Sequence, residues 1–106
     1  MDTNKNMNNN SNKNASELLT YVIEQENTEK MDKAMELYDK QNYTQALSLL
    51  NIVISQDNKD SNAYYYRAMV YDAQKKYSLA INDYKKALEN NSEMLIANYA
   101  IAVDYD

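Results

Sequence analysis

The chain repeats at a fixed interval, and the repeated positions are those at which neighbouring helices would pack. Ala34, Ala68 and Ala102 are evenly spaced, and the same interval separates Tyr43 from Tyr77. A fixed period of about 34 residues is typical of stacked helix-turn-helix units, each of which buries its apolar face only against its neighbours. The period therefore predicts an all-α solenoid of antiparallel helix pairs. Because such arrays present an extended surface, it also favours binding over catalysis.

Residue types that are missing from the chain argue against several classes of chemistry. There is no Gly, so loops that cradle the phosphates of nucleotides are not expected. There is no His, the commonest general base and metal ligand, and no Cys to supply a thiolate or a disulfide. No nucleophile with a matching base can be assembled from the remaining residues. We therefore predict a protein that is not an enzyme and that has no cofactor and no metal site.

The charge of the chain restricts its partners. The formal net charge is -5, which argues against nucleic acid and against an anionic membrane surface, since both attract Lys and Arg. No apolar run approaches the roughly 18 residues that a membrane-spanning helix needs. The first residues contain no apolar stretch of the kind found in secretory signals. We expect a cytoplasmic protein by default, with a protein or peptide partner, no nucleic acid and no membrane.

The N-terminal part divides into two segments before the repeats begin. Residues 1–14 are dominated by Asn and cannot bury enough apolar area to offset their ordering entropy, so we expect a disordered tail. In residues 15–27, Leu18, Leu19 and Val22 fall on one face of a helix. This segment is either a short lead-in helix or the start of one long helix that runs into the first repeat. The predicted division is a tail over 1–14, a lead-in helix over 15–27 and a repeat domain over 28–106.

The repeat domain contains about two and a half units. We place the repeats at about 28–60 and 61–94, followed by a half repeat at 95–106. The apolar periodicity predicts two helix pairs, with polar links between units. The four expected helices are 28–40, 44–56, 61–74 and 78–90.

The second repeat carries the residues of a known pattern. Its first helix has Tyr64, Arg67, Ala68 and Tyr71, which correspond to the pattern Trp-x2-Leu-Gly-x2-Tyr. Its second helix has Ala80, Tyr84 and Ala87, which correspond to Ala-x3-Phe and the following Ala, and Ser92 stands where Pro is usual. The chain resembles the tetratricopeptide repeat family over residues 28–106. This resemblance implies a right-handed superhelix that binds other proteins and catalyses no reaction.

The chain departs from the family pattern at a few positions. Gln41 and Lys75 stand in the turns where Gly is frequent, and Arg67 stands where Leu is expected. Arg67 has two interpretations. Its stem lies over the core and its head reaches a carboxylate, or it projects into a binding site for a partner.

The resemblance also implies a binding groove. In this family the first helix of each pair lines the concave face, where peptides commonly bind. Adaptable Met and amphipathic Tyr side chains at these positions suit a peptide groove. Alternatively, neighbouring helices of this chain or residues 16–25 cover part of this face. The residues expected in the groove are Met31, Met35, Tyr38, Asn62, Tyr65, Tyr66, Met69, Tyr99 and Val103.

One binding mode known in the family is not expected here. A subclass binds acidic C-termini through a clamp of Lys, Asn and Arg. None of those residue types stands at the corresponding positions, which are Met31, Met35, Tyr66, Ile96 and Ala100. An acidic protein without that basic pocket should prefer an apolar or basic peptide.

The C-terminal segment suggests an alternative function. Residues 95–106 are apolar on nearly every side, whereas a helix that caps a repeat array needs a polar outer face. Either the array continues beyond this segment, or a second copy of the chain covers it. The alternative to peptide binding is therefore self-assembly into a homo-oligomer. The residues expected in a homodimer contact are Leu95, Ile96, Tyr99, Ile101, Val103 and Tyr105.

Overall fold

The protein is a stack of helices. The computed structural model describes residues 2–93, and it describes side chains from residue 14 onward. The helices are α1 (Asp2–Asp39), α2 (Tyr43–Gln56), α3 (Ser61–Ala73) and α4 (Tyr77–Asn90), with no strand within residues 2–93. The predicted all-α class is confirmed. Helices α2, α3 and α4 begin and end within one residue of the ranges expected from the sequence.

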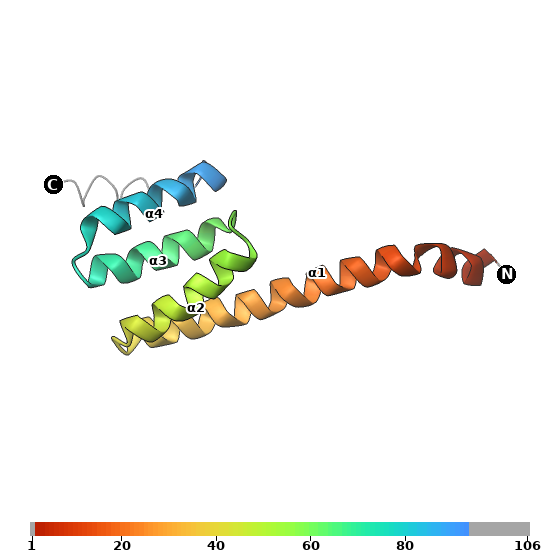
Figure 1. Ribbon diagram of the computed structural model, residues 1–106, viewed down its shortest axis with the longest axis horizontal. Helices are drawn as coiled ribbons and strands as arrows, with labels where there is room; N and C mark the ends of the chain where they lie inside the picture. The colour runs from red at the N-terminus through yellow and green to blue at the C-terminus, as the bar shows by residue number, and fades with distance from the viewer. Residues whose placement is uncertain (1, 94–106) are drawn as a thin grey trace.

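The helices pack in chain order as antiparallel pairs. α1 packs on α2 and α3 packs on α4, while α2 and α3 join the two pairs. Figure 1 shows α2, α3 and α4 side by side, with the C-terminal part of α1 along α2 and its N-terminal part extending away from the stack. α1 is polar for most of its length, and none of the helices within residues 2–93 combines the length and the apolar character needed to cross a membrane.

α1 runs without a break from Asp2 to Asp39. Of the two alternatives for residues 15–27, the structure has the second, in which this segment belongs to one long helix that runs into the first repeat. The physical reason is that this stretch contains neither Gly nor Pro, the two residues that most strongly end a helix. The division of the chain into tail, lead-in helix and repeat domain stays a prediction.

The period of the sequence recurs in the backbone of the two turns inside the helix pairs. Gln41 and Lys75 both adopt the left-handed conformation, with φ of 63° and 64°. Each turn closes with the two hydrogen bonds of a Schellman motif, which satisfies carbonyl groups at the end of the first helix. The bonds run from the N–H of Gln41 to the carbonyl of Tyr38 (2.9 Å), Asn42 to Leu37 (2.8 Å), Lys75 to Asp72 (2.9 Å) and Lys76 to Tyr71 (2.9 Å). The two repeats therefore reverse the chain in the same way.

The alanines of the repeat mark the places where the helices cross. Ala34, Ala46, Ala68 and Ala80 are fully buried, and their small side chains allow two helix backbones to approach closely. The buried side chains form two clusters, one shared by α1, α2 and α3 and the other by α3 and α4. The first contains Met31, Leu50, Val53, Ala63 and Val70, and the second contains Tyr64, Tyr84 and Ala87.

Arg67 of α3 forms hydrogen bonds with residues of both neighbouring helices, α2 and α4. Its guanidinium donates to both carboxylate oxygens of Asp83 on α4, at 2.7 and 2.9 Å, and to Oδ1 of Asn51 on α2, at 3.0 Å. The guanidinium carbon also lies 5.7 Å from the ring centroid of Tyr64 and 5.9 Å from that of Tyr71. The hydrogen bond to Asp83 raises the pKa of Arg67. The structure therefore agrees with the first interpretation of Arg67, in which its guanidinium binds a carboxylate of the same chain.

Candidate functional site

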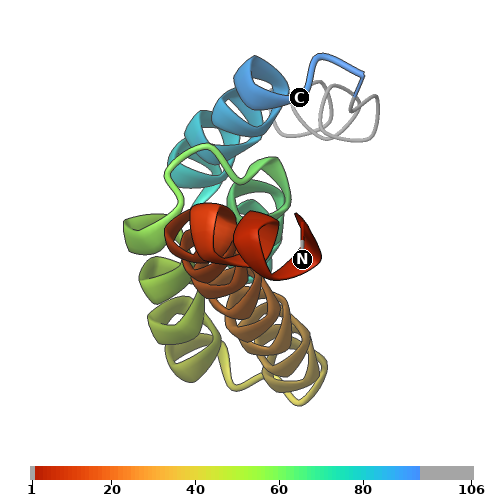
Figure 2. The ribbon, with the colours of Figure 1, turned by 90° about the vertical axis from the view of Figure 1, so that its right-hand side faces the viewer.

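The first helices of the two pairs form one side of the stack. Figure 2, which looks nearly along the helices, shows α1 and α3 towards one side and α2 and α4 towards the other. This is the arrangement expected for a concave face built from first helices. The residues expected in the groove come from α1 and α3, so their exposure decides what this face presents.

Tyrosines of α1 and α3 on this face contact other aromatic rings within the stack. Tyr65 and Tyr66 of α3 have ring centroids 5.9 Å apart, and Tyr65 lies 5.7 Å from Tyr84 of α4, both pairs tilted by 50°. On α1, Tyr38 lies 5.9 Å from Tyr43 of α2. Tilted contacts at these separations are favourable between aromatic rings. The rings therefore hold one another in place and leave part of each surface open, since Tyr38, Tyr65 and Tyr66 are half-buried.

Burial perturbs two of these hydroxyl groups. It raises the pKa of Tyr38 above the usual value of 10.0, and the nearby Tyr43, Asp39 and Asp72 add to the effect. Burial raises the pKa of Tyr65 in the same direction, with contributions from Tyr66 and Tyr38. At neutral pH both hydroxyls keep their protons and can donate hydrogen bonds.

The structure separates the residues expected in the groove into three groups. Met35, Tyr38, Tyr65, Tyr66 and Met69 are half-buried on the α1 and α3 face, and we call these five residues the tyrosine groove, after the groove that the family resemblance led us to expect. Met31 is only 8% exposed and belongs to the core of the first helix pair, because it faces α2. Asn62 is exposed at the start of α3. Tyr99 and Val103 lie outside the described residues, as do Leu95, Ile96, Ile101 and Tyr105.

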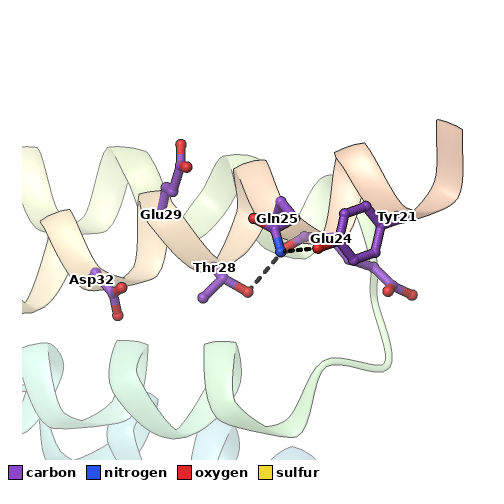
Figure 3. Close-up of a pocket in the computed structure, with 6 residues that line it drawn as sticks. All are labelled: Tyr21, Glu24, Gln25, Thr28, Glu29 and Asp32. Carbon is purple, nitrogen blue, oxygen red and sulfur yellow. Dashed lines mark hydrogen bonds between the residues drawn. The ribbon is translucent and has the colours of Figure 1, made fainter. Parts of the chain in front are cut away.

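An acidic cavity on α1 continues the line of the tyrosine groove. Its volume is about 410 Å³, and Figure 3 shows Thr28 and Asp32 on the side of α1 that faces α3. The amide of Gln25 donates to the hydroxyl of Tyr21 at 2.9 Å and orders one end of the cavity. Helical spacing carries the line from Asp32 to Met35 of the tyrosine groove. The lining residues are Tyr21, Glu24, Gln25, Thr28, Glu29 and Asp32.

The sequence analysis did not predict this cavity, although the spacing of residues along α1 indicates its position. Charged residues on a helix usually form a solvated face, and nothing in their type sets Glu24 or Asp32 apart from Glu26. The useful signal is the spacing of Tyr21, Thr28 and Met35, which places them on one stripe of α1. The α1 and α3 face can bind through aromatic surfaces, thioethers and carboxylates. Within residues 14–93, no three Asp, Glu, His or Cys side chains gather as a metal site would require.

The comparison with known proteins agrees with the geometry. A family model described as Tetratricopeptide repeat matches residues 61–94, which span α3, its turn at Lys75, α4 and the start of the following link. No curated protein matches the chain. The matched segment is the complete second helix pair, whose turn conformation and buried alanines recur one period earlier, in α1 and α2. The chain therefore contains a tetratricopeptide repeat at residues 61–94.

Proposed function

We propose that this protein is a non-enzymatic scaffold that binds a peptide or protein segment in the tyrosine groove. Tetratricopeptide repeats generally serve as protein interaction modules, and the chain contains such a repeat at residues 61–94. The groove consists of large, amphipathic side chains that α1 and α3 present on the same side of the stack. The binding role of its five residues is the proposal, and the fold supports it.

The observation that carries the proposal is the half-buried state of Tyr38, Tyr65 and Tyr66. Each ring is fixed on one side by neighbouring aromatic or core residues and is open on the other. A rigid tyrosine offers a large contact area and a hydroxyl at a low entropic cost. Met35 and Met69 flank the rings with flexible thioethers that adapt to different ligands. A surface of this size should bind a short segment with a Kd on the order of 1 μM, or about -8 kcal/mol.

The test uses substitutions in the groove and a matched tyrosine outside it. A peptide selected from a random library against the full chain is titrated by calorimetry into the wild type, Tyr66→Ala and Met69→Ala. We expect each variant to bind at least several-fold more weakly, because each loses part of the contact surface. Tyr77→Ala removes a ring that is 47% exposed on α4 and should leave the affinity unchanged. Circular dichroism shows whether each variant is folded. Equal affinity in the wild type, Tyr66→Ala and Met69→Ala would place the binding site elsewhere.

Self-assembly is the second candidate function, and exposed residues on α1 favour it. Leu18 and Leu19 are 63% and 62% exposed, and Val22 is 41% exposed on the same segment. Contiguous apolar surface of this kind commonly marks an interaction site. The contact expected through residues 95–106 lies outside the described residues. Light scattering on a sizing column, across a range of concentrations, tests assembly by comparing the full chain with Leu19→Glu and Ile101→Glu. A dimer that either variant dissociates would support assembly, and a monomer at every concentration would contradict it.

A further inference from the structure

The N-terminal part of α1 extends beyond the stack. Figure 1 shows this part of the helix projecting away from α2, α3 and α4. Every residue from 14 to 26 is exposed, whereas Asn27 and Met31 further along the same helix are buried. Two properties of this exposed stretch, its aliphatic side chains and its low helix propensity, point to a missing partner.

Four of the exposed side chains are large and aliphatic. Their spacing along the helix places them within one broad stripe, as in a helix that packs on a neighbour. A contiguous apolar surface of this kind on a soluble protein commonly marks an interaction site. We call these four residues the aliphatic patch. They are Leu18, Leu19, Val22 and Ile23, with exposed fractions of 63%, 62%, 41% and 38%.

The composition of this part of α1 gives the helix little stability of its own. Seven of the thirteen residues in 2–14 are Asn, which has a low helix propensity. Isolated helices of about 12–15 residues are marginal in water even when they are rich in Ala, and most helices in proteins depend on the packing of an apolar face. A partner on the aliphatic patch would supply that packing. The sequence of α1 therefore indicates that its extension is stabilised by another helix.

The charges along α1 specify which helix fits and in which direction. Residues 2–14 contain two Lys and one Asp, a net charge of +1, and residues 27–39 contain two Lys, two Glu and two Asp, a net charge of -2. If two α1 helices lie antiparallel across the patch, the first segment of each copy lies alongside the second segment of the other. If they lie parallel, each acidic segment lies alongside its own counterpart and is repelled. The two ends of α1 are thus complementary to each other, as a two-fold contact between identical copies requires.

We propose that two copies of this chain pair through the aliphatic patch, with their α1 helices antiparallel. The two-fold axis passes between Thr20 and Tyr21, at the centre of the patch. Leu19 of one copy then packs on Val22 of the other, in the spacing of a short antiparallel coiled coil, and the other two residues of the patch flank this contact. Because eight aliphatic side chains make a small interface, the dimer should dissociate on dilution. This pairing rests on the self-assembly function considered above and is one specific form of it.

Light scattering on a sizing column, across a range of concentrations, tests the surface. The full chain is compared with Leu19→Glu and with the control Leu79→Glu, which makes the same change at a residue that is 48% exposed on α4. We expect Leu19→Glu to raise the dissociation constant of the dimer at least about tenfold, because it places two carboxylates in an apolar contact, and Leu79→Glu to leave it unchanged. Circular dichroism shows whether each variant is folded. A dimer that Leu19→Glu leaves intact, or that both variants weaken equally, would overturn the proposal.

Cysteine crosslinking tests the direction of the pairing, because the chain has no Cys of its own. Leu19→Cys and Val22→Cys chains, one of them isotopically labelled, are mixed and oxidised with glutathione disulfide, and the crosslinked peptides are identified by mass spectrometry. We expect disulfides between positions 19 and 22 to exceed those that join two identical positions, since only close sulfur atoms can be bridged. An excess of disulfides between identical positions would show a parallel pair and overturn the proposal.

The α1 pairing and self-assembly in general can fail separately. If Leu19→Glu leaves the dimer intact and Ile101→Glu dissociates it, the chain assembles through residues 95–106 and the α1 pairing is overturned. If the wild type is a monomer at every concentration, both are overturned. If Leu19→Glu dissociates the dimer and disulfides join positions 19 and 22, both stand.

Discussion

Arg67 of α3 holds the carboxylate of Asp83 of α4 through two parallel hydrogen bonds, from Nε to Oδ2 at 2.7 Å and from Nη2 to Oδ1 at 2.9 Å. Asp83 is only 1% exposed, so its charge depends on this one partner for compensation. The pair lies inside the second helix pair, at a position where the family usually has Leu. A buried ion pair is costly to break, although it adds little over apolar residues of similar volume.

The first prediction concerns the removal of Arg67 from its ion pair with Asp83. Arg67→Leu should lower the free energy of unfolding by about 3–5 kcal/mol, because it leaves the carboxylate of Asp83 buried and uncompensated. The double variant Arg67→Leu/Asp83→Leu should recover most of this loss, since it removes both charges. Urea denaturation followed by circular dichroism measures both. A single variant as stable as the wild type would show that Asp83 reaches water or another partner.

An exposed ion pair provides the comparison for this prediction. Nζ of Lys33 lies 3.4 Å from Oε2 of Glu36 on α1, and the two side chains are 58% and 62% exposed. Surface pairs of this kind on a helix contribute less than about 0.5 kcal/mol. Lys33→Ala should therefore change the denaturation midpoint little. A loss as large as that of Arg67→Leu would mean that burial does not control the effect of these pairs.

The second prediction concerns the two turns with positive φ. Gln41→Gly and Lys75→Gly should each raise the free energy of unfolding by about 0.5–1 kcal/mol, because the left-handed conformation costs a residue with a side chain about 1–2 kcal/mol. The greater freedom of unfolded Gly offsets part of that gain. The turns share no partner, so the two effects should add.

Thermal denaturation of the two single variants and of the double variant measures these gains. Lys40→Gly is the matched control, because Lys40 precedes Gln41 and does not have positive φ. That variant should be less stable than the wild type, because Gly increases the conformational entropy of the unfolded chain and Lys40 has no left-handed conformation for Gly to relieve. A destabilised Gln41→Gly variant would contradict the left-handed geometry of this turn.

The third prediction concerns stability at alkaline pH. Burial raises the pKa of Tyr38 and of Tyr65 above 10.0. For a group whose pKa is higher in the folded state, the contribution to stability is complete below the unfolded pKa and is lost as pH rises through the folded pKa. The free energy of unfolding should therefore fall as pH rises above about 10.

Phenylalanine substitutions assign that loss to particular residues. Tyr38→Phe and Tyr65→Phe remove the ionisable hydroxyl and should each reduce the fall in stability at alkaline pH. Tyr77→Phe removes an exposed hydroxyl from α4 and should leave the pH profile as it is in the wild type. Urea denaturation at a series of pH values gives these profiles. Parallel profiles in all four proteins would show that neither Tyr38 nor Tyr65 is responsible.

Much of the fold was predictable because the repeat places small residues at helix crossings. Ala34 and Ala68 were assigned to helix packing from their spacing, and both are fully buried. The continuity of α1 was less predictable, because no local signal distinguishes a lead-in helix from the start of a longer one. Arg67 was also ambiguous, since the position of its acceptor Asp83 depends on how α3 and α4 pack.

The residues of the candidate site could be predicted only where helix register alone decides which face of the helix a side chain occupies. Register assigned Tyr38, Tyr65 and Tyr66 to the α1 and α3 face, where the structure has them half-buried. Register alone did not show that Met31 faces the core of the first pair, because the boundary between core and groove depends on the exact rotation of α1. A cavity of about 240 Å³ that Asn27 lines beside the end of α2 was not predictable, since it requires α1 to extend past the end of α2.

The last prediction concerns the stability of the protein at Asn27. This residue lies on the same face of α1 as Met31 and Ala34, which are core residues. Asn27→Leu removes a buried acceptor, Oδ1, that has no donor within the described part of the chain, and it places an apolar side chain of similar size on that face. We expect the free energy of unfolding to rise by about 1 kcal/mol, near the lower end of the cost of a buried unpaired polar group.

Asn82→Leu on α4 is the control, since Asn82 is exposed and its substitution should change stability by less than about 0.5 kcal/mol. Urea denaturation followed by circular dichroism measures the free energy of unfolding of both variants. A less stable Asn27→Leu variant would show that the amide has a partner within the folded chain.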